Sequence, residues 1–282
     1  MPEAVHRRRA MLFVGALALE ALPAALASGA DLVVIDLEDA VPPGRKEEGR
    51  EAVVAALAGL AIPKGTQLVA RVNEIRTPEG DADVRALAGC AGPLGALMPP
   101  KVNSVAEVAR AVELSEGARA PFDLYPIIET CEGLEQCAAI AWASTQLKAL
   151  VFGGFDLSTA LGCEMAWEPL LYARSRVVHA AAWAGVDCID SPYPAIEDLG
   201  GLRDACARAK ALGMTGKAAK HASQVRTILE CFTPTGSEIE RARRIVAAFE
   251  EDPTRPLVYE GKLVERPAIK RLERIAAFET ER

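Results

Sequence analysis

The sequence is poor in aromatic residues and histidines and has no excess of positive charge. Its 282 residues include 7 Phe, 4 Tyr and 3 Trp, although half of the chain is hydrophobic, so the core must be mainly aliphatic. The 32 basic residues are outnumbered by 39 acidic ones, and this net charge of −7 argues against binding to nucleic acid. No run reaches the roughly 18 uncharged apolar residues of a membrane span. The sequence therefore predicts a globular protein without nucleic-acid or membrane partners.

The seven cysteines form no C-x-x-C pair. An odd number at irregular spacing is typical of reduced thiols, which favours a cytoplasmic protein. The start of the chain resembles a signal peptide, because three arginines at 7–9 precede an apolar run. However, Glu20 and Pro23 interrupt that run, which is patterned as a strand followed by a helix. We therefore expect this segment to begin the fold.

Short apolar runs alternate with longer amphipathic segments along most of the chain. The predicted strands are 11–14, 32–36, 68–73, 95–98, 123–128, 149–152, 186–189 and 215–219, and the predicted helices are 17–28, 45–60, 80–88, 104–117, 132–145, 169–184, 197–212 and 222–230. Strands that are apolar throughout are typical of a parallel sheet covered on both faces. Eight strand–helix repeats favour an α/β fold of the (β/α)8 TIM-barrel type. A doubly wound open sheet is the alternative, but the motifs of its nucleotide-binding forms, G-x-G-x-x-G and G-x-x-x-x-G-K-[ST], are missing.

The composition changes near the end of the chain. Residues 236–282 hold ten acidic and ten basic residues, so the whole net charge of −7 lies on the preceding part. We predict a catalytic barrel over 1–233 and a C-terminal lid or oligomerisation segment over 234–282. The pattern of this segment predicts helices at 237–251 and 267–280, a turn at Asp252-Pro253 and a strand pair around 257–264. Because it is too small to bury a core of its own, it must pack on the barrel or on a neighbour.

Polar residues follow several predicted strands, where the active sites of barrels lie. Glu129 and Asp156 end consecutive strands, and adjacent strands lie about 4.8 Å apart, so the two carboxylates could share one cation. Two carboxylates with room for water and substrate suit Mg²⁺. With three histidines in the chain, of which only His221 lies near a strand end, a zinc site is disfavoured. The alternative is that Glu129 and Asp156 merely cap helices.

An ordered set of motifs then resembles the HpcH/HpaI aldolase and citrate lyase beta subunit family of CoA-ester lyases. The matching stretches are R-R-A-M-L-F-V at 8–14, D-L-V-V-I-D-L-E-D-A-V-P-P at 31–43, R-V-N at 71–73, M-P-P-K-V at 98–102, I-I-E-T at 127–130, G-G-F-D-L at 153–157, G-K-A-A-K-H-A-S-Q-V at 216–225 and G-K-L-V-E-R-P at 261–267. The resemblance implies a Mg²⁺-dependent barrel that cleaves or forms a C–C bond beside a carbonyl, with an acyl-CoA thioester or 2-oxo acid as its small-molecule substrate.

The resemblance also implies roles for individual residues. Arg71 matches the substrate-binding arginine, and Glu129 and Asp156 match the metal ligands. A cation such as Arg71 can stabilise a developing enolate or a carboxylate. Glu38 and Asp39 would orient Arg71 and the waters of the metal. The alternatives are that Arg71 is a strand arginine paired to Glu38 or Asp39, and that these two acids form a solvated loop. Gly154 and Phe155, beside Asp156, are expected to contact the substrate together with Glu129. Further cations that could attract its carboxylates or phosphates are Arg9, Lys101 and Lys217.

The C-terminal segment departs from the family pattern. In several members its motif places an aspartate over the active site of a neighbouring subunit, and Glu265 occupies that place here. A glutamate keeps the acid but adds a methylene, which would change the geometry of proton transfer. Glu265 is therefore a candidate catalytic residue, or else an exposed acid of the tail. The resemblance suggests a homo-oligomer, either a trimer or a hexamer. A CoA-independent aldolase of pyruvate and an aldehyde, and a non-catalytic lyase-like subunit of a larger complex, are the alternative functions.

Overall fold

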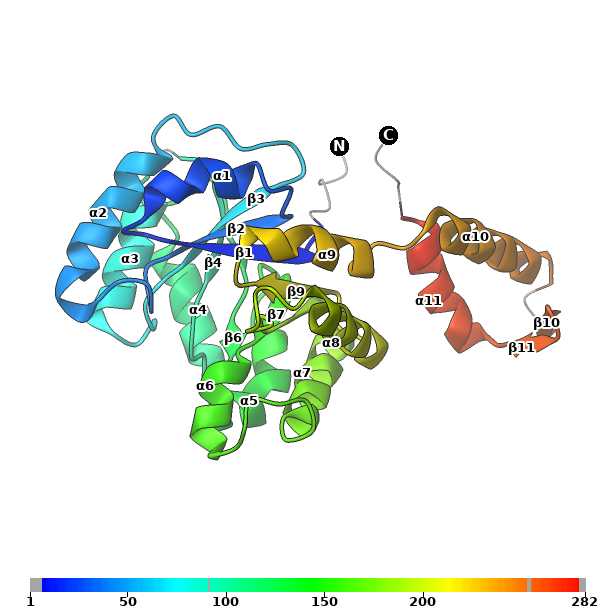
Figure 1. Ribbon diagram of the computed structural model, residues 1–282. Coiled ribbons are helices and arrows are strands. Elements are labelled where there is room, and N and C mark those ends of the chain that lie inside the picture. The colour runs from blue at the N-terminus through cyan, green and yellow to red at the C-terminus, as the bar shows by residue number, and fades with distance from the viewer. Residues whose placement is uncertain (1–6, 91, 253–254, 279–282) are drawn as a thin grey trace. The chain divides into compact units, whose positions relative to one another are not determined.

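The computed structural model describes residues 7–90, 92–252 and 255–278. The chain divides into two compact units, Met1–Phe232 and Thr233–Arg282. The first contains the parallel sheet and the helices that cover it, and the second contains two helices and a strand pair (Figure 1).

The strands of the first unit form a single parallel sheet in the order β5-β4-β3-β2-β1-β9-β8-β7-β6. Their bounds are β1 Ala10–Gly15, β2 Leu32–Asp36, β3 Gln67–Arg71, β4 Leu94–Met98, β5 Asp123–Leu124, β6 Ile127–Ile128, β7 Ala149–Phe152, β8 Asp187–Asp190 and β9 Gly216–Ala219. Each predicted strand is found within a few residues of its expected position.

The two edges of this sheet, β5 and β6, are halves of one segment that is interrupted by Tyr125 and Pro126. The Tyr125 N–H donates to Leu97 O of β4 at 2.9 Å, while Pro126 O accepts from Val151 N of β7 at 3.0 Å. Pro126 has no N–H to continue the ladder, and this divides the strand. Since the same segment bonds to neighbours on both sides, the sheet closes on itself. The predicted (β/α)8 barrel is confirmed, with its fifth strand in two pieces.

Helices follow the strands around the barrel (Figure 1). Their bounds are α1 Leu22–Leu26, α2 Lys46–Leu57, α3 Pro78–Ala88, α4 Val105–Leu114, α5 Cys131–Ala141, α6 Gly154–Leu161, α7 Leu171–Ala184, α8 Leu199–Leu212 and α9 Ala222–Phe232, with short 3-10 turns at Leu19–Ala21 and Pro43–Arg45. Sequence patterning missed α6, because Gly153-Gly154 reads as a turn and the helix has only 8 residues. This helix carries Asp156 in its first turn.

The barrel has an apolar interior that is mainly aliphatic, as the shortage of aromatic residues predicts. Met11, Val34, Met98 and Val151 belong to one buried cluster. A second and larger buried cluster includes apolar side chains of the strands and of the helices that surround them. Burying apolar surface on both faces of the strands stabilises the sheet by about 25 cal/mol per Å² removed from water.

The second unit contains α10 Gly236–Glu251, β10 Leu257–Tyr259, β11 Lys262–Val264 and α11 Arg266–Ala276, in the order expected from the sequence. The Thr235 hydroxyl and the Glu238 carboxylate cap the start of α10 reciprocally. Ile245, Phe249 and Ile269 form a small buried cluster. Of the predicted turn at Asp252-Pro253, Pro253 lies outside the described residues.

Over residues 7–90, 92–252 and 255–278, the structure contains no helix with the length and hydropathy that crossing a membrane requires.

Candidate active site

A cavity of about 390 Å³ lies at the carboxyl ends of the barrel strands. Its apolar walls include Phe13, Ile127 and Val151, and its charged lining is Asp36, Asp39, Arg71, Glu129, Asp156 and Lys220. Strand ends converge here because all the strands of the barrel run parallel. The cavity therefore collects most of the polar residues that the sequence places after strands.

Arg71, the last residue of β3, is the most strongly paired cation of this cavity. Its guanidinium donates to Asp36 through Nε at 2.7 Å and Nη2 at 2.6 Å, and it forms ion pairs with Glu38 at 2.9 Å and Asp39 at 3.2 Å. Although burial opposes the charged form, hydrogen bonding to Asp36 and the neighbouring acids raise the pKa of Arg71. The guanidinium therefore stays charged, and its position is fixed by the β2 strand end. The sequence predicts Glu38 and Asp39 as partners of Arg71, but the contact with Asp36 follows only from the fold.

Glu129, which follows β6, is a buried carboxylate with only 4% of its surface exposed. Its Oε1 accepts a hydrogen bond from the backbone N–H of Lys101 at 3.0 Å. Burial, together with the negative charges of Glu38 and Asp156, raises the pKa of Glu129 to about 8. A side chain at Gly153 would lie 2.4 Å from both Cβ and Oε2 of Glu129, so only glycine fits at this position.

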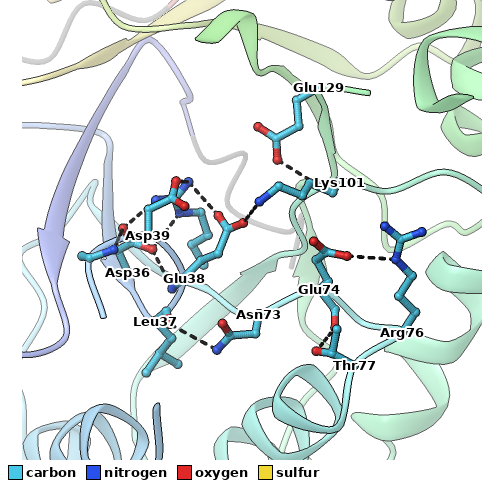
Figure 2. Close-up of polar contacts among 12 residues, drawn as sticks. Asp36, Leu37, Glu38, Asp39, Asn73, Glu74, Arg76, Thr77, Lys101 and Glu129 are labelled. Carbon is cyan, nitrogen blue, oxygen red and sulfur yellow. Dashed lines mark hydrogen bonds and ion pairs between the residues drawn. The ribbon is translucent and has the colours of Figure 1, made fainter. Parts of the chain in front are cut away.

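Lys101 connects Glu38 with Glu129. Its ammonium bonds to Glu38, while its backbone N–H points to Glu129 (Figure 2). The φ angle of Lys101 is 50°, which is uncommon for a residue with a side chain. This conformation accompanies the hydrogen bond from its backbone to the carboxylate of Glu129. Lys101 is thus a residue of the site, although its sequence context did not distinguish it from a surface cation.

Asp156 lies in the first turn of α6, and its neighbours Gly154 and Phe155 line the same cavity. No side chain caps the start of this helix. Helix starts leave backbone N–H groups without intrahelical partners, and these groups favour anions. The cavity therefore has a carboxylate pair next to a helix end suited to an anionic ligand.

The donor set of this cavity fits Mg²⁺. Glu129 and Asp156 offer hard oxygen atoms, and they lie close enough for the charge of one to raise the pKa of the other. Within the described part of the chain, no group of three or more His, Cys, Asp or Glu side chains is arranged to hold a metal. Mg²⁺ is commonly bound through one or two carboxylates and keeps several waters, so two protein ligands suffice.

The structure does not bring every predicted residue to this cavity. Arg9 precedes β1 at the opposite, amino end of the barrel, where its backbone N–H and its guanidinium bond to Asp31 at 2.8–2.9 Å. Arg9 is therefore paired with Asp31 at the end of the barrel opposite the cavity, and its predicted role in substrate binding stays a prediction. Glu265 is exposed and precedes α11 in the second unit. Its predicted catalytic role stays a prediction.

Lys217 follows the same pattern: the sequence suggests that it could attract an anionic substrate, but its side chain is buried and paired within the protein. Its ammonium is buried and bonds to Asp190 at 2.5 Å and to Ser191 O at 2.7 Å. Sequence reasoning gave no role to Ser191 or Lys220, both of which line the cavity. Their positions directly after β8 and β9 could have indicated this role in the sequence, because the carboxyl ends of the strands gather at this face of the barrel.

The chain is similar to known proteins over most of its length. The family model for HpcH/HpaI aldolase/citrate lyase matches residues 9–222. An L-malyl-CoA/beta-methylmalyl-CoA lyase of Cereibacter sphaeroides is 32% identical over 276 residues, covering 88% of this chain and 86% of the relative. The mitochondrial citramalyl-CoA lyase of Homo sapiens is 27% identical, covering 97% of this chain and 86% of the relative.

A solved structure shows the same fold. The protein CitE from Mycobacterium tuberculosis, in complex with magnesium, acetoacetate and coenzyme A, is 29% identical and has a TM-score of 0.78, covering 96% of this chain and 99% of that one. The family model spans most of the barrel, including Arg71, Glu129 and Asp156. The chain belongs to the HpcH/HpaI aldolase/citrate lyase family.

Proposed function

We propose that this protein is a Mg²⁺-dependent carbon–carbon lyase that cleaves or forms a 3-hydroxyacyl-CoA thioester. The observation that carries the proposal is the meeting of Glu129 and Asp156 in one cavity with the fixed cation Arg71. Family membership supports the class of enzyme, since the relatives described above are named as lyases of malyl-CoA and citramalyl-CoA. Malyl-, citramalyl- and citryl-CoA are the candidate substrates.

In the cleavage direction, the 3-hydroxyl group of the thioester loses its proton and becomes the carbonyl of a 2-oxo acid. The C2–C3 bond breaks, and its electron pair passes into the enolate of the acyl-CoA. Protonation at C2 then completes the acyl-CoA product. The site must therefore bind a carboxylate beside a carbonyl and stabilise a negative charge on the thioester oxygen.

Glu129 and Asp156 would hold Mg²⁺, which supplies a Lewis acid for the carboxylate and adjacent oxygen of the 2-oxo acid. The start of α6, where Gly154 and Phe155 line the cavity, favours the same carboxylate through its backbone N–H groups. Together these groups orient the reacting carbon before bond cleavage.

Arg71 stabilises negative charge that develops on the thioester oxygen. Asp36 and Glu38 hold its guanidinium in place, so little reorganisation accompanies the reaction. Asp39 lines the cavity and also pairs with Arg71. We assign Glu38 and Asp39 the role of positioning residues for this arginine.

The test is an assay of the purified protein with Mg²⁺ and a panel of malyl-, citramalyl- and citryl-CoA, with release of free 2-oxo acid as the readout. We expect turnover of at least one thioester and loss of that turnover after treatment with EDTA. Absence of turnover on every thioester, with no effect of EDTA, would contradict the proposal. Activity on pyruvate and an aldehyde without CoA would assign the protein to the aldolase alternative.

A further inference from the structure

Lys220, directly after β9, lies at the rim of the active-site cavity. Its ammonium nitrogen is 4.9 Å from the centre of the Phe155 ring, and both residues line the cavity. A cation over an aromatic face is held there by the ring quadrupole. The contact therefore places the charge of Lys220 beside the first turn of α6, where Phe155 immediately precedes Asp156.

The other cations near the cavity already have acidic partners. Arg71 is paired with Asp36, Glu38 and Asp39. Lys101 is paired with Glu38, and Lys217 with Asp190. In the parts of the chain that the structure describes, no carboxylate forms an ion pair with Lys220, whose side chain is exposed. Lys220 is thus the cation of this cavity that remains available to an anionic ligand.

The position of Lys220 also limits which anion it can meet. In the proposed function, the first carboxylate of a 2-oxo acid lies at Glu129, Asp156 and the start of α6. A positive charge above Phe155 is then adjacent to that binding position but separate from the metal ligands. Apart from the neutral hydroxyl of Ser191 and the already paired Arg71, the remaining cavity lining is apolar or acidic, so a second carboxylate on the same 2-oxo acid would find its charged partner at Lys220.

We propose that Lys220 is a specificity-determining residue that binds the second carboxylate of a dicarboxylic 2-oxo acid. This inference rests on the proposed function and narrows its substrate class: the site should prefer a 2-oxo acid with two carboxylates over one with a single carboxylate. An ammonium that makes charge-assisted hydrogen bonds in a partly enclosed cavity can provide such a preference.

The test is isothermal titration of the Mg²⁺-loaded protein with freshly dissolved oxaloacetate and with pyruvate. We expect the wild-type protein to bind oxaloacetate about tenfold more tightly than pyruvate, and Lys220→Met to remove most of that difference. Lys220→Arg should restore it, because arginine keeps the positive charge and the contact with the aromatic ring. Lys148→Met is the matched control, since Lys148 is bonded to Thr145 O and lies at the amino end of β7.

The outcomes separate this inference from the proposed function. If the wild-type protein binds neither 2-oxo acid, the proposed function fails and the inference fails with it. If it binds pyruvate without preferring oxaloacetate, or if Lys220→Met weakens both ligands equally, only the inference is overturned. If Lys220→Met leaves the preference for oxaloacetate over pyruvate unchanged, the inference is likewise overturned.

Discussion

Arg71 and Asp36 form a two-point ion pair between neighbouring strands β3 and β2. The guanidinium Nε and Nη2 lie 2.7 and 2.6 Å from the two carboxylate oxygens. Asp36 also accepts hydrogen bonds from the backbone N–H groups of Glu38 and Ala40, at 2.9 and 3.2 Å. One carboxylate therefore fixes both the arginine of the cavity and the loop that supplies Glu38 and Asp39.

Asp36→Asn should destabilise the protein, because it removes one of the three acidic charges that compensate the buried guanidinium of Arg71, the one bonded to it at two points. Breaking a buried ion pair by changing one partner costs about 3–5 kcal/mol. Urea unfolding should show this loss as a lower transition midpoint. As a control, Glu48→Gln disrupts the exposed Arg45–Glu48 pair and should leave the midpoint unchanged. Equal effects of the two substitutions would contradict the structural role assigned to Asp36.

Asp156→Ala should abolish measurable Mg²⁺ binding while leaving the fold intact. Asp156 is half-buried in the first turn of α6 and is not a core residue. Titration calorimetry with Mg²⁺ measures the loss, and circular dichroism checks the fold. Glu132→Ala is the matched control, because Glu132 is an exposed acid in the first turn of α5, the helix that follows Glu129. Unchanged Mg²⁺ affinity in Asp156→Ala would reject the ligand assignment.

Gly153→Ala should weaken Mg²⁺ binding without altering any ligand. The new methyl group would lie 2.4 Å from Cβ and Oε2 of Glu129 and 2.8 Å from Ile127, so the carboxylate must move. We expect Mg²⁺ affinity to fall by about tenfold or more, since metal sites depend on the orientation of their ligands. Gly44→Ala is the control, because a methyl group there meets open space. If Gly153→Ala binds Mg²⁺ as tightly as the wild-type protein, Glu129 is not a metal ligand in the position that the structure gives it.

Glu265→Ala tests whether the second unit supplies an acid to the active site of a neighbouring subunit. We expect turnover to fall by about 10²–10⁴-fold, the range of general acid–base catalysis, with Mg²⁺ affinity unchanged. A co-expressed mixture of Glu265→Ala and Asp156→Ala subunits should regain activity, because each subunit restores what the other lacks. Full activity of Glu265→Ala would show that this exposed acid takes no part in catalysis. Inactive mixtures that contain both subunits in one oligomer would exclude action between subunits.

Several features of the fold are encoded locally in the sequence. Apolar runs such as residues 32–36 and 149–152 predict strands that are buried on both faces, and their alternation with helices predicts the barrel. Because parallel strands all finish at one end of the sheet, the sequence predicts Glu129 and Asp156 there, and in the structure both line one cavity. The charge composition and amphipathic pattern change after the barrel and predict a separate C-terminal segment over 234–282, while the structure divides the chain into two compact units after Phe232.

Other features depend on the register and packing of the folded chain. The sequence could not show that Pro126 divides the fifth strand while both halves stay in the sheet, nor that α6 begins immediately after Gly153. Arg9 and Arg71 look alike as cations beside strands, yet Arg9 lies before its strand and Arg71 ends one, so they occupy opposite ends of the barrel.

The sequence is sufficient to predict the order of strands and helices, the aliphatic core and the set of acids after the strands, because these follow from local hydrophobic periodicity. The partner that each charged side chain meets depends on the folded chain. Asp36 with Arg71, Lys101 with Glu38 and Lys220 with Phe155 each join segments far apart in the chain. Such contacts arise from closure of the barrel, which brings the ends of separate strands around one cavity.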